Sequence, residues 1–122
     1  MQIFKKFRFE AAHFLPHLPE DHKCRRMHGH SFEAEIYVGG PMDERLGWVI
    51  DFADVAQAFK PLEEKLDHRL LNEVEGLENP TSENLARWFW EHLETPLPGL
   101  CRVVVRETCN AGCIYDGPRT QD

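Results

Sequence analysis

Three histidines in the first quarter of the chain have the spacing of metal ligands. His28 and His30 are two positions apart in a segment whose even positions are otherwise apolar, so a strand there would direct both side chains to one face. His13 belongs to an earlier alternating segment, residues 3–15, that we expect to pair antiparallel with the strand of His28 and His30. Each alone is more simply an ordinary histidine of a half-buried sheet. Three imidazoles converging from two strands instead favour a zinc ion with an open fourth position.

Cys24 precedes His28 by four positions, just before the start of the same predicted strand. The neighbouring Lys23 and Arg25 and a nearby divalent cation would favour its thiolate form. A thiolate close to zinc but not bound to it could accept a proton from a substrate carbon. The sequence leaves two alternatives open: a fourth zinc ligand, which would make the site structural, or an inert loop thiol.

Two further carboxylates are candidates for chemistry. Asp67 directly precedes His68, and a histidine oriented by a carboxylate is the usual general acid–base pair. Adjacent side chains often point apart, so a solvated helix end is the alternative. Glu107 shares an otherwise apolar strand face, and a buried carboxylate needs a partner. Either a protein arginine or a flat ligand with two parallel N–H groups would supply one.

The elements that position these residues follow the order strand, strand, helix, helix, strand, strand. Alternation predicts strands over 3–15, 28–38, 100–109 and 113–115, and helical spacing predicts a first helix over about 53–66. Pro61 predicts a kink or break in that helix, and Thr81 predicts the N-cap of a second helix that ends before Pro96. We expect a single α+β domain over 1–122, a four-stranded antiparallel sheet with both helices on one face.

The composition excludes several classes of partner. A net charge of −7 in 122 residues and a pI of about 5.5 argue against a nucleic-acid or anionic-membrane surface. No apolar run approaches the ~20 residues of a membrane helix, and the first residues lack the pattern of a signal peptide. We therefore expect a cytoplasmic protein with reduced thiols. The four cysteines have no C-x-x-C spacing, which disfavours a tetrathiolate metal site.

Six stretches together resemble the 6-pyruvoyl-tetrahydropterin synthase family, and within it the 6-carboxy branch. They are residues 9–13, 24–30, 48–52, 66–68, 78–83 and 107–115, which run from the first predicted strand to the last. The three residues between Cys24 and His28 match the 6-carboxy branch, whereas the 6-pyruvoyl branch has a longer gap.

The resemblance implies a tunnelling fold, in which sheets of several subunits close into a barrel with active sites at the interfaces. Members of the family are commonly homohexamers, dimers of trimers. The implied reaction converts 7,8-dihydroneopterin triphosphate to 6-carboxy-5,6,7,8-tetrahydropterin, acetaldehyde and triphosphate, on the route to 7-deazaguanine bases such as queuosine. The 6-pyruvoyl activity on the same substrate, or a non-catalytic zinc-containing domain that binds a pterin, are the alternatives.

The resemblance also implies roles for individual residues. Three of them would hold zinc, which would polarise the substrate side chain. The others would move protons or bind the pterin. The zinc ligands would be His13, His28 and His30, the proton acceptor Cys24, the proton relay Asp67 and His68, and the pterin contacts Glu107 and Thr81. Thr81 would then have to combine pterin binding with its capping role. Our own candidates for the triphosphate are the basic residues Lys23, Arg25 and Arg26.

Overall fold

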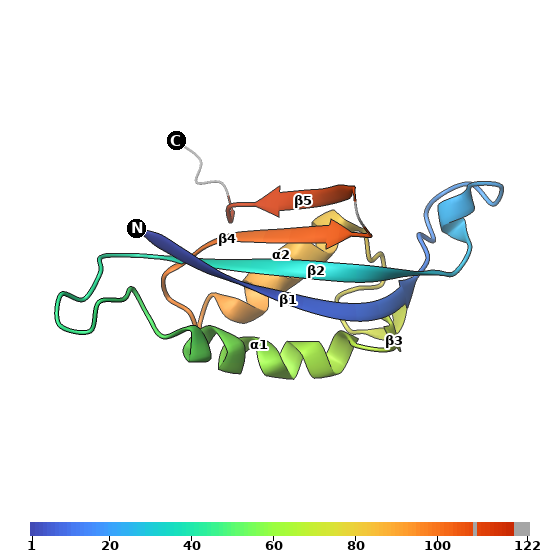
Figure 1. Ribbon diagram of the computed structural model, residues 1–122. Helices are drawn as coiled ribbons and strands as arrows, with labels where there is room; N and C mark the ends of the chain where they lie inside the picture. The colour runs from blue at the N-terminus through green and yellow to red at the C-terminus, as the bar shows by residue number, and fades with distance from the viewer. Residues whose placement is uncertain (109, 119–122) are drawn as a thin grey trace.

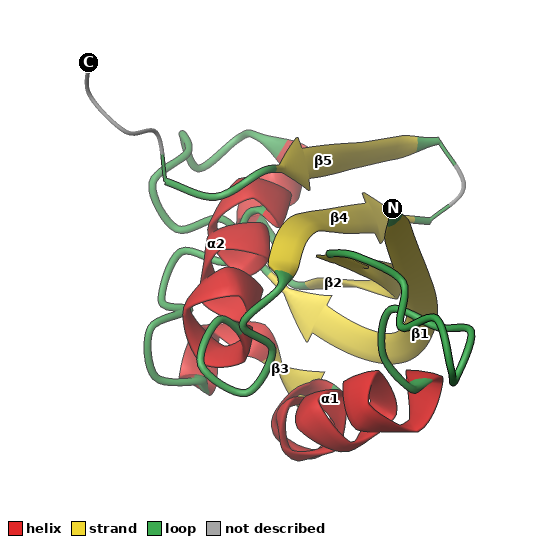
Figure 2. Ribbon diagram, turned by 90° about the vertical axis from the view of Figure 1, so that its left-hand side faces the viewer, coloured by secondary structure: helices red, strands yellow, loops and turns green. Residues whose placement is uncertain are grey.

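The computed structural model describes residues 1–108 and 110–118. Five strands form one sheet in the order β3-β1-β2-β4-β5, and two helices cover one of its faces (Figures 1 and 2). The elements are β1 (Gln2–His13), β2 (His28–Gly39), α1 (Phe52–Leu66), β3 (Arg69–Leu70), α2 (Ser82–Leu93), β4 (Leu100–Glu107) and β5 (Ala111–Tyr115), with short 3-10 turns at Lys23–Arg25 and Leu71–Glu73. Cys109, where the third predicted strand ended, lies outside the described residues.

The expected four-stranded antiparallel sheet is wrong in one respect, because a fifth strand makes the sheet mixed. β3 runs parallel to β1 and pairs Arg69 with Ala11 and Leu70 with Ala12. The chain reverses after α1 at His68, whose φ is 60° and whose backbone N–H donates to the Glu10 carbonyl at 2.6 Å. That turn lays the next two residues along the edge of β1. A two-residue strand has no periodicity that a sequence could display.

The strand alternation expected from the sequence separates the two faces of the sheet. We call the face beneath α1 and α2 the covered face and the other the open face. In the β1–β2 pair, Phe9 lies opposite Phe32 on the covered face, with the rings stacked 5.2 Å apart. Both side chains are fully buried beneath Phe89 of α2. The covered face is therefore the core side, and residues that share its parity are held in a packed apolar layer.

The second helix begins at the predicted cap Thr81, and the first has a cap at Asp51 that was not predicted. The Asp51 carboxylate accepts the Ala53 N–H at 2.9 Å at the start of α1, and the Thr81 hydroxyl accepts the Asn84 N–H at 3.1 Å at the start of α2. Pro61 does not break α1, which runs on to Leu66. It lies on the exposed side of the helix, so its ring meets solvent and not the core. No helix among residues 1–108 and 110–118 is long and apolar enough to cross a membrane.

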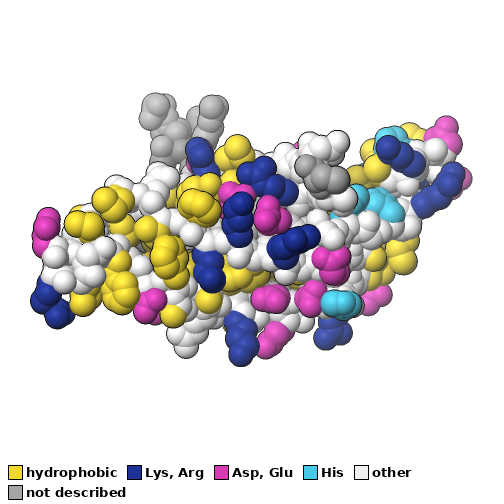
Figure 3. All heavy atoms as spheres, viewed as in Figure 1, with side chains coloured by type: hydrophobic (Ala, Val, Ile, Leu, Met, Phe, Trp, Pro, Cys, Tyr) yellow, Lys and Arg dark blue, Asp and Glu magenta, His cyan; other side chains and the backbone are white. Residues whose placement is uncertain are grey.

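The open face carries charged side chains of both signs, which mix over the middle of the sheet (Figure 3). Glu35 pairs with Lys6 on one side and Val104 on the other, and it is only 2% exposed although no helix covers it. The Arg106 guanidinium donates to its carboxylate at 2.8 Å and the Tyr37 hydroxyl at 3.1 Å. Neighbouring side chains therefore bury this carboxylate.

Candidate active site

The three histidines of the sequence analysis meet at one end of the covered face. His13 lies opposite His28 in the β1–β2 pair, and His30 lies opposite Ala11, two residues along. One ring nitrogen from each lies within 4.8 Å of the others, and the ring centroids are 4.6 to 5.1 Å apart. His13 is 2% exposed, and the other two are half-buried. We call these residues the histidine cluster.

Each imidazole of the histidine cluster uses its Nδ1 for a hydrogen bond to an oxygen. The partners are the Pro80 carbonyl for His13 at 2.8 Å, the Arg26 carbonyl for His28 at 2.7 Å and the Thr108 hydroxyl for His30 at 2.8 Å. A carbonyl oxygen can only accept, so His13 and His28 carry their proton on Nδ1. This leaves the Nε2 lone pair of those two rings free, the arrangement typical of histidines that bind metal. The Thr108 hydroxyl can either accept from the His30 ring or donate to it.

The donor set fits a zinc ion. Three neutral imidazoles with a fourth position open are the ligands of catalytic zinc, and in a tetrahedral site their nitrogens would lie about 3.3 Å apart at Zn–N distances of about 2.0–2.1 Å. The observed ring nitrogens all lie within 4.8 Å of one another, so the rings would draw closer together on binding the ion. Burial lowers the pKa of His13, and the Pro80 hydrogen bond and the nearby Glu107 charge oppose that shift only in part. His13 is therefore held in the neutral form that a metal requires.

Cys24 lies in the 3-10 turn just before β2 and is half-buried. Its carbonyl accepts the Leu15 N–H at 2.8 Å, and its own N–H donates to the His22 ring at 3.1 Å, which ties the turn to the end of β1. The thiol is not part of the group of ligand atoms formed by the histidine cluster. This counts against a fourth ligand and leaves two possibilities for the thiol, a proton acceptor or an inert loop thiol.

The basic residues around Cys24 differ in how far they are already engaged. Arg25 donates to the Leu18 carbonyl at 3.0 Å and is half-buried, whereas Lys23 and Arg26 are exposed. All three belong to the turn that carries the thiol, which keeps them as candidates for an anionic group of a ligand.

Glu107 ends β4 on the covered face, opposite Phe32. It is half-buried and lines a cleft of about 420 Å³ together with Leu15, Thr81 and Cys113. Over residues 1–108 and 110–118, no arginine or lysine forms an ion pair with it. Of the two partners considered from the sequence, the protein arginine is therefore not the one used, and the carboxylate is available to a ligand.

Thr81 lines the same cleft and is also the N-cap of α2. Its oxygen accepts the Asn84 N–H, but a hydroxyl has a proton to donate as well. The capping role therefore leaves the O–H free to donate to a ligand in the cleft. The two roles that seemed to compete are compatible.

Asp67 and His68 do contact each other at the edge of β1. The Asp67 carboxylate lies 3.0 Å from the His68 Nδ1 and also accepts the Glu10 N–H at 2.9 Å. The Glu10 N–H and then the His68 ring hold the pKa of Asp67 below its usual value. The His68 side chain is 78% exposed, so its Nε2 faces solvent. This pair has the geometry of a general acid–base group with an open reaction side.

The Asp67–His68 pair lies outside the group of ligand atoms formed by the histidine cluster. His68 lines a cleft of about 630 Å³ with Glu10 and Ser31, which alternation places on the open face, and His30 and Thr108 line the same cleft. The Ser31 hydroxyl donates to the Glu10 carboxylate there at 2.6 Å. Within one chain, His68 and one ring of the cluster therefore border a common cleft, although His68 is not one of the grouped ligands.

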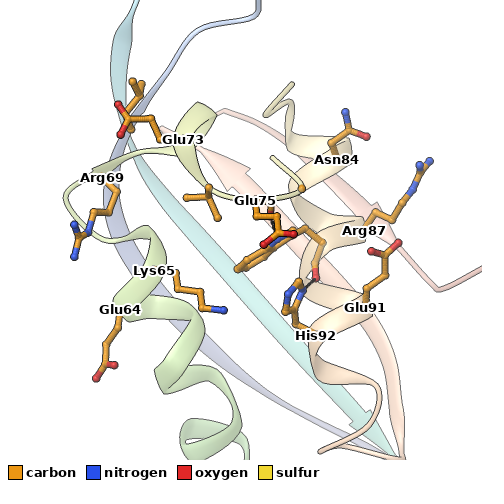
Figure 4. Close-up of a pocket in the computed structure, with 13 residues that line it drawn as sticks. Glu64, Lys65, Arg69, Glu73, Glu75, Asn84, Arg87, Glu91 and His92 are labelled. Carbon is orange, nitrogen blue, oxygen red and sulfur yellow. Dashed lines mark hydrogen bonds between the residues drawn. The ribbon is translucent and has the colours of Figure 1, made fainter. Parts of the chain in front are cut away.

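A wider groove of about 950 Å³ lies between α1 and α2, and it shares no lining residue with the histidine cluster. Lys65 and His92 point into it in Figure 4, while Glu64 and Arg87 point away. The His92 ring stacks on buried Trp88 at 4.2 Å, and its Nδ1 contacts the Trp88 carbonyl. The charged groups at the rim have both signs and no convergent geometry, so the groove is not the candidate site.

Sequence reasoning missed the groups that orient the histidines. The Pro80 carbonyl belongs to the backbone and has no sequence signal. Thr108 could have been noticed, because it directly follows Glu107 and precedes a turn. Its contact with His30 nevertheless depends on β2 and β4 being neighbours, which the sequence alone does not establish.

Comparison with known proteins gives one consistent result. A model of the family described as 6-pyruvoyl tetrahydropterin synthase matches residues 2–118. A 6-carboxy-5,6,7,8-tetrahydropterin synthase of Synechocystis is 45% identical, over 96% of this chain and 94% of the relative. A dihydroneopterin monophosphate aldolase of Pyrococcus furiosus is 34% identical over 80% and 79%. The structure of the Caenorhabditis elegans 6-pyruvoyl tetrahydropterin synthase superposes with a TM-score of 0.89, at 27% identity over 97% and 96% of the chains.

Proposed function

The chain belongs to the 6-pyruvoyl tetrahydropterin synthase family, and from that premise we propose that it is a zinc-dependent carbon–carbon lyase. Its substrate would be 7,8-dihydroneopterin triphosphate, and its products 6-carboxy-5,6,7,8-tetrahydropterin, acetaldehyde and triphosphate, on the route to queuosine. The observation that carries the proposal is the histidine cluster, in which His13 and His28 have Nε2 free, beside Glu107, which forms no ion pair within residues 1–108 and 110–118. Zinc bound there would supply a Lewis acid for the oxygens of the substrate side chain.

Glu107 would anchor the pterin. Its carboxylate can accept two parallel N–H bonds from the amino-pyrimidine edge, a charge-assisted pair that fixes the plane of the ring. Thr81 would add a hydroxyl donor from the other wall of the same cleft. Lys23, Arg25 and Arg26 would hold the triphosphate near the turn that carries Cys24. Substrate contacts at both ends would place the side chain of the pterin next to the histidine cluster.

Cys24 and His68 would move the protons. The Cys24 thiolate would remove a proton from the substrate side chain, and His68 would return one through its exposed Nε2. Asp67 keeps the His68 ring oriented through Nδ1, and its lowered pKa keeps the carboxylate charged at neutral pH. A thiol and an imidazole thus divide the two proton transfers.

We further infer that the working form is a homo-oligomer, a dimer of trimers whose sheets close into a barrel. The support is the family to which the chain belongs, together with the position of His68 outside the group of ligand atoms of the histidine cluster. A second copy that supplies Asp67 and His68 would complete the site. Mixing an inactive C24A protein with an inactive H68A protein after dissociation and reassembly should then restore part of the activity. A mixture that stays inactive would count against shared sites.

The main test is incubation of the zinc-loaded protein with dihydroneopterin triphosphate and an assay for acetaldehyde. The 6-pyruvoyl activity would release triphosphate without acetaldehyde, and an aldolase would leave a hydroxymethyl pterin. Absence of acetaldehyde from a metal-replete preparation would refute the proposed reaction.

The C24A variant separates the lyase from a non-catalytic zinc domain. Loss of acetaldehyde with zinc retained is expected if the thiol is a proton acceptor. Loss of zinc would show that Cys24 is a fourth ligand and that the site is structural. A C101A variant, which changes a half-buried thiol at the start of β4, is the matched control.

A further inference from the structure

Thr108 is the hydrogen-bond partner of one ring of the histidine cluster, and it differs in kind from the partners of the other two rings. His13 and His28 are oriented by backbone carbonyls, whereas the His30 Nδ1 lies 2.8 Å from a side-chain hydroxyl. A carbonyl cannot be removed by substitution, and a hydroxyl can. The orientation of His30 is therefore the one that a single side chain controls.

The backbone of Thr108 is held in an uncommon conformation. Its φ is 25°, a region that β-branched residues rarely adopt and that persists only where the surroundings enforce it. The Thr108 N–H donates to the Ser31 carbonyl at 3.0 Å, and the Thr108 carbonyl accepts the Asn110 N–H at 2.7 Å. The first bond joins the end of β4 to β2 directly beside His30, and the second links Thr108 to the turn that follows. The hydroxyl in this position lies 2.8 Å from the His30 Nδ1.

The direction of the His30 hydrogen bond decides whether the ring can bind a metal through Nε2. If Nδ1–H donates to the Thr108 hydroxyl, the lone pair is on Nε2, as it is in His13 and His28. If the hydroxyl instead donates to Nδ1, a neutral ring carries its proton on Nε2 and cannot bind there. A hydroxyl accepts either arrangement because its proton rotates.

We propose that Thr108 is a positioning residue that holds His30 in the metal-binding tautomer and orientation. It also links the ring to Glu107, its neighbour in the chain, so that the metal ligand and the pterin anchor keep a fixed separation. The inference rests on the proposed zinc site and assigns to it a side chain outside the ligand set. Partners of this kind typically contribute about 10- to 100-fold to metal affinity.

The test compares zinc affinities of T108V and T108S with that of the unsubstituted protein, by competition with a chromogenic chelator at fixed pH. Valine keeps the branched shape and removes the hydroxyl, so zinc should bind about 10- to 100-fold more weakly. Serine keeps the hydroxyl and should stay within about threefold. T95V makes the same chemical change at an exposed threonine after α2 and should have no effect. Zinc binding by T108V within threefold of the unsubstituted protein would overturn the proposal.

A structural role is separated from a positioning role by the metal-free proteins. Metal-free T108V should melt at the Tm of the unsubstituted metal-free protein, because the hydroxyl acts through the ring. If T108V does not fold, long-range 1H–15N spectra of the unsubstituted zinc protein decide the matter. A proton on the His30 Nδ1 would support the proposal, and a proton on Nε2 would overturn it. Failure of the unsubstituted protein to bind zinc would refute the proposed zinc site itself, whatever T108V does.

Discussion

The two faces of the sheet bury one ionisable side chain each to the same extent, and they satisfy it in different ways. His13 on the covered face and Glu35 on the open face are both 2% exposed. His13 bonds to the Pro80 carbonyl and keeps Nε2 free, next to His28, which is held in the same way by the Arg26 carbonyl. Glu35 accepts hydrogen bonds on both oxygens, from Tyr37 and Arg106. The covered face therefore ends in ring nitrogens with free lone pairs. On the open face, both carboxylate oxygens of Glu35 are already hydrogen-bonded.

The charge states follow the same division. Burial lowers the pKa of His13 and keeps it neutral. Burial also raises the pKa of Glu35, but the hydrogen bonds from Arg106 and then Tyr37 outweigh it, so the net pKa is lowered and the carboxylate stays charged. A free lone pair on a neutral ring can bind a cation, whereas a paired carboxylate stabilises the sheet. The difference between a functional and a structural polar cluster thus lies in what remains unpaired.

The largest effect should come from removing a ligand of the covered face. We expect H28A to lose zinc and to lower kcat/KM about 10³-fold or more, because a Lewis acid supplies several kcal/mol to the transition state. His28 is half-buried, so its loss should leave the core intact. Zinc content by atomic spectroscopy and acetaldehyde release are the measurements. H92A, which removes an exposed histidine on α2, is the control. Full zinc content in H28A would contradict the prediction that the covered face binds zinc and the open face does not.

The next effect concerns the Asp67–His68 pair beside the open face. We expect H68A to lower kcat about 10²- to 10⁴-fold, the usual contribution of a general acid–base residue. Zinc content should remain that of the unsubstituted protein, because His68 does not belong to the histidine cluster. D67N should have a smaller effect on kcat, since it disturbs the orientation of the ring and leaves the ring in place. Zinc loss in H68A would mean that the pair and the cluster are one site within a chain.

The open-face network should be visible in the pH dependence of stability. The folded pKa of Glu35 lies below its unfolded value, so its contribution is present above the unfolded pKa of about 4.3 and is lost as pH falls through the folded pKa. At pH 7, E35Q should lower the free energy of unfolding by about 1.5–3 kcal/mol, the contribution of hydrogen bonds to a charged group. Urea unfolding at pH 7 and at low pH should show the two proteins converging in acid.

Glu33 provides the control for Glu35. Its carboxylate is 3.6 Å from Arg106 and 28% exposed, so E33Q should cost less than about 1 kcal/mol at pH 7. Equal costs for E35Q and E33Q would show that burial of Glu35 does not matter. A difference between E35Q and the unsubstituted protein that is independent of pH would show that its charge does not matter.

The sequence predicts the covered face well and the open face poorly. Alternation places His13, His28 and His30 together because an apolar pattern marks which side is buried. The same pattern treats Glu35 as a solvated residue, because it says nothing of neighbouring strands. Burial of Glu35 depends on Tyr37, two residues along the same strand, and on Arg106, which only the β2–β4 register brings close. The strand β3 could not be predicted for the same reason, because its pairing with β1 is non-local.

The candidate site divides along the same line. Cys24 and the histidine cluster lie close in sequence or in paired strands, so spacing could propose them. The acceptors of the ring protons could not be proposed, because a carbonyl such as Pro80 has no residue-type signal. The contact between Asp67 and His68 could not be predicted for another reason. The side chains of adjacent residues point apart unless the backbone turns. Here the φ of 60° at His68 turns it.

The smallest effect tests whether Thr81 contributes both to stability and to ligand binding. T81A removes the N-cap of α2 and should lower the free energy of unfolding by about 1 kcal/mol, while T81S should restore it. If the Thr81 hydroxyl also donates to the pterin, T81A should raise KM for dihydroneopterin triphosphate, and T81S should restore that too. An unchanged KM in T81A would leave Thr81 as a cap alone. Glu107 would then be the only predicted pterin contact of the cleft, and zinc content should be the same in all three proteins because neither role touches the histidine cluster.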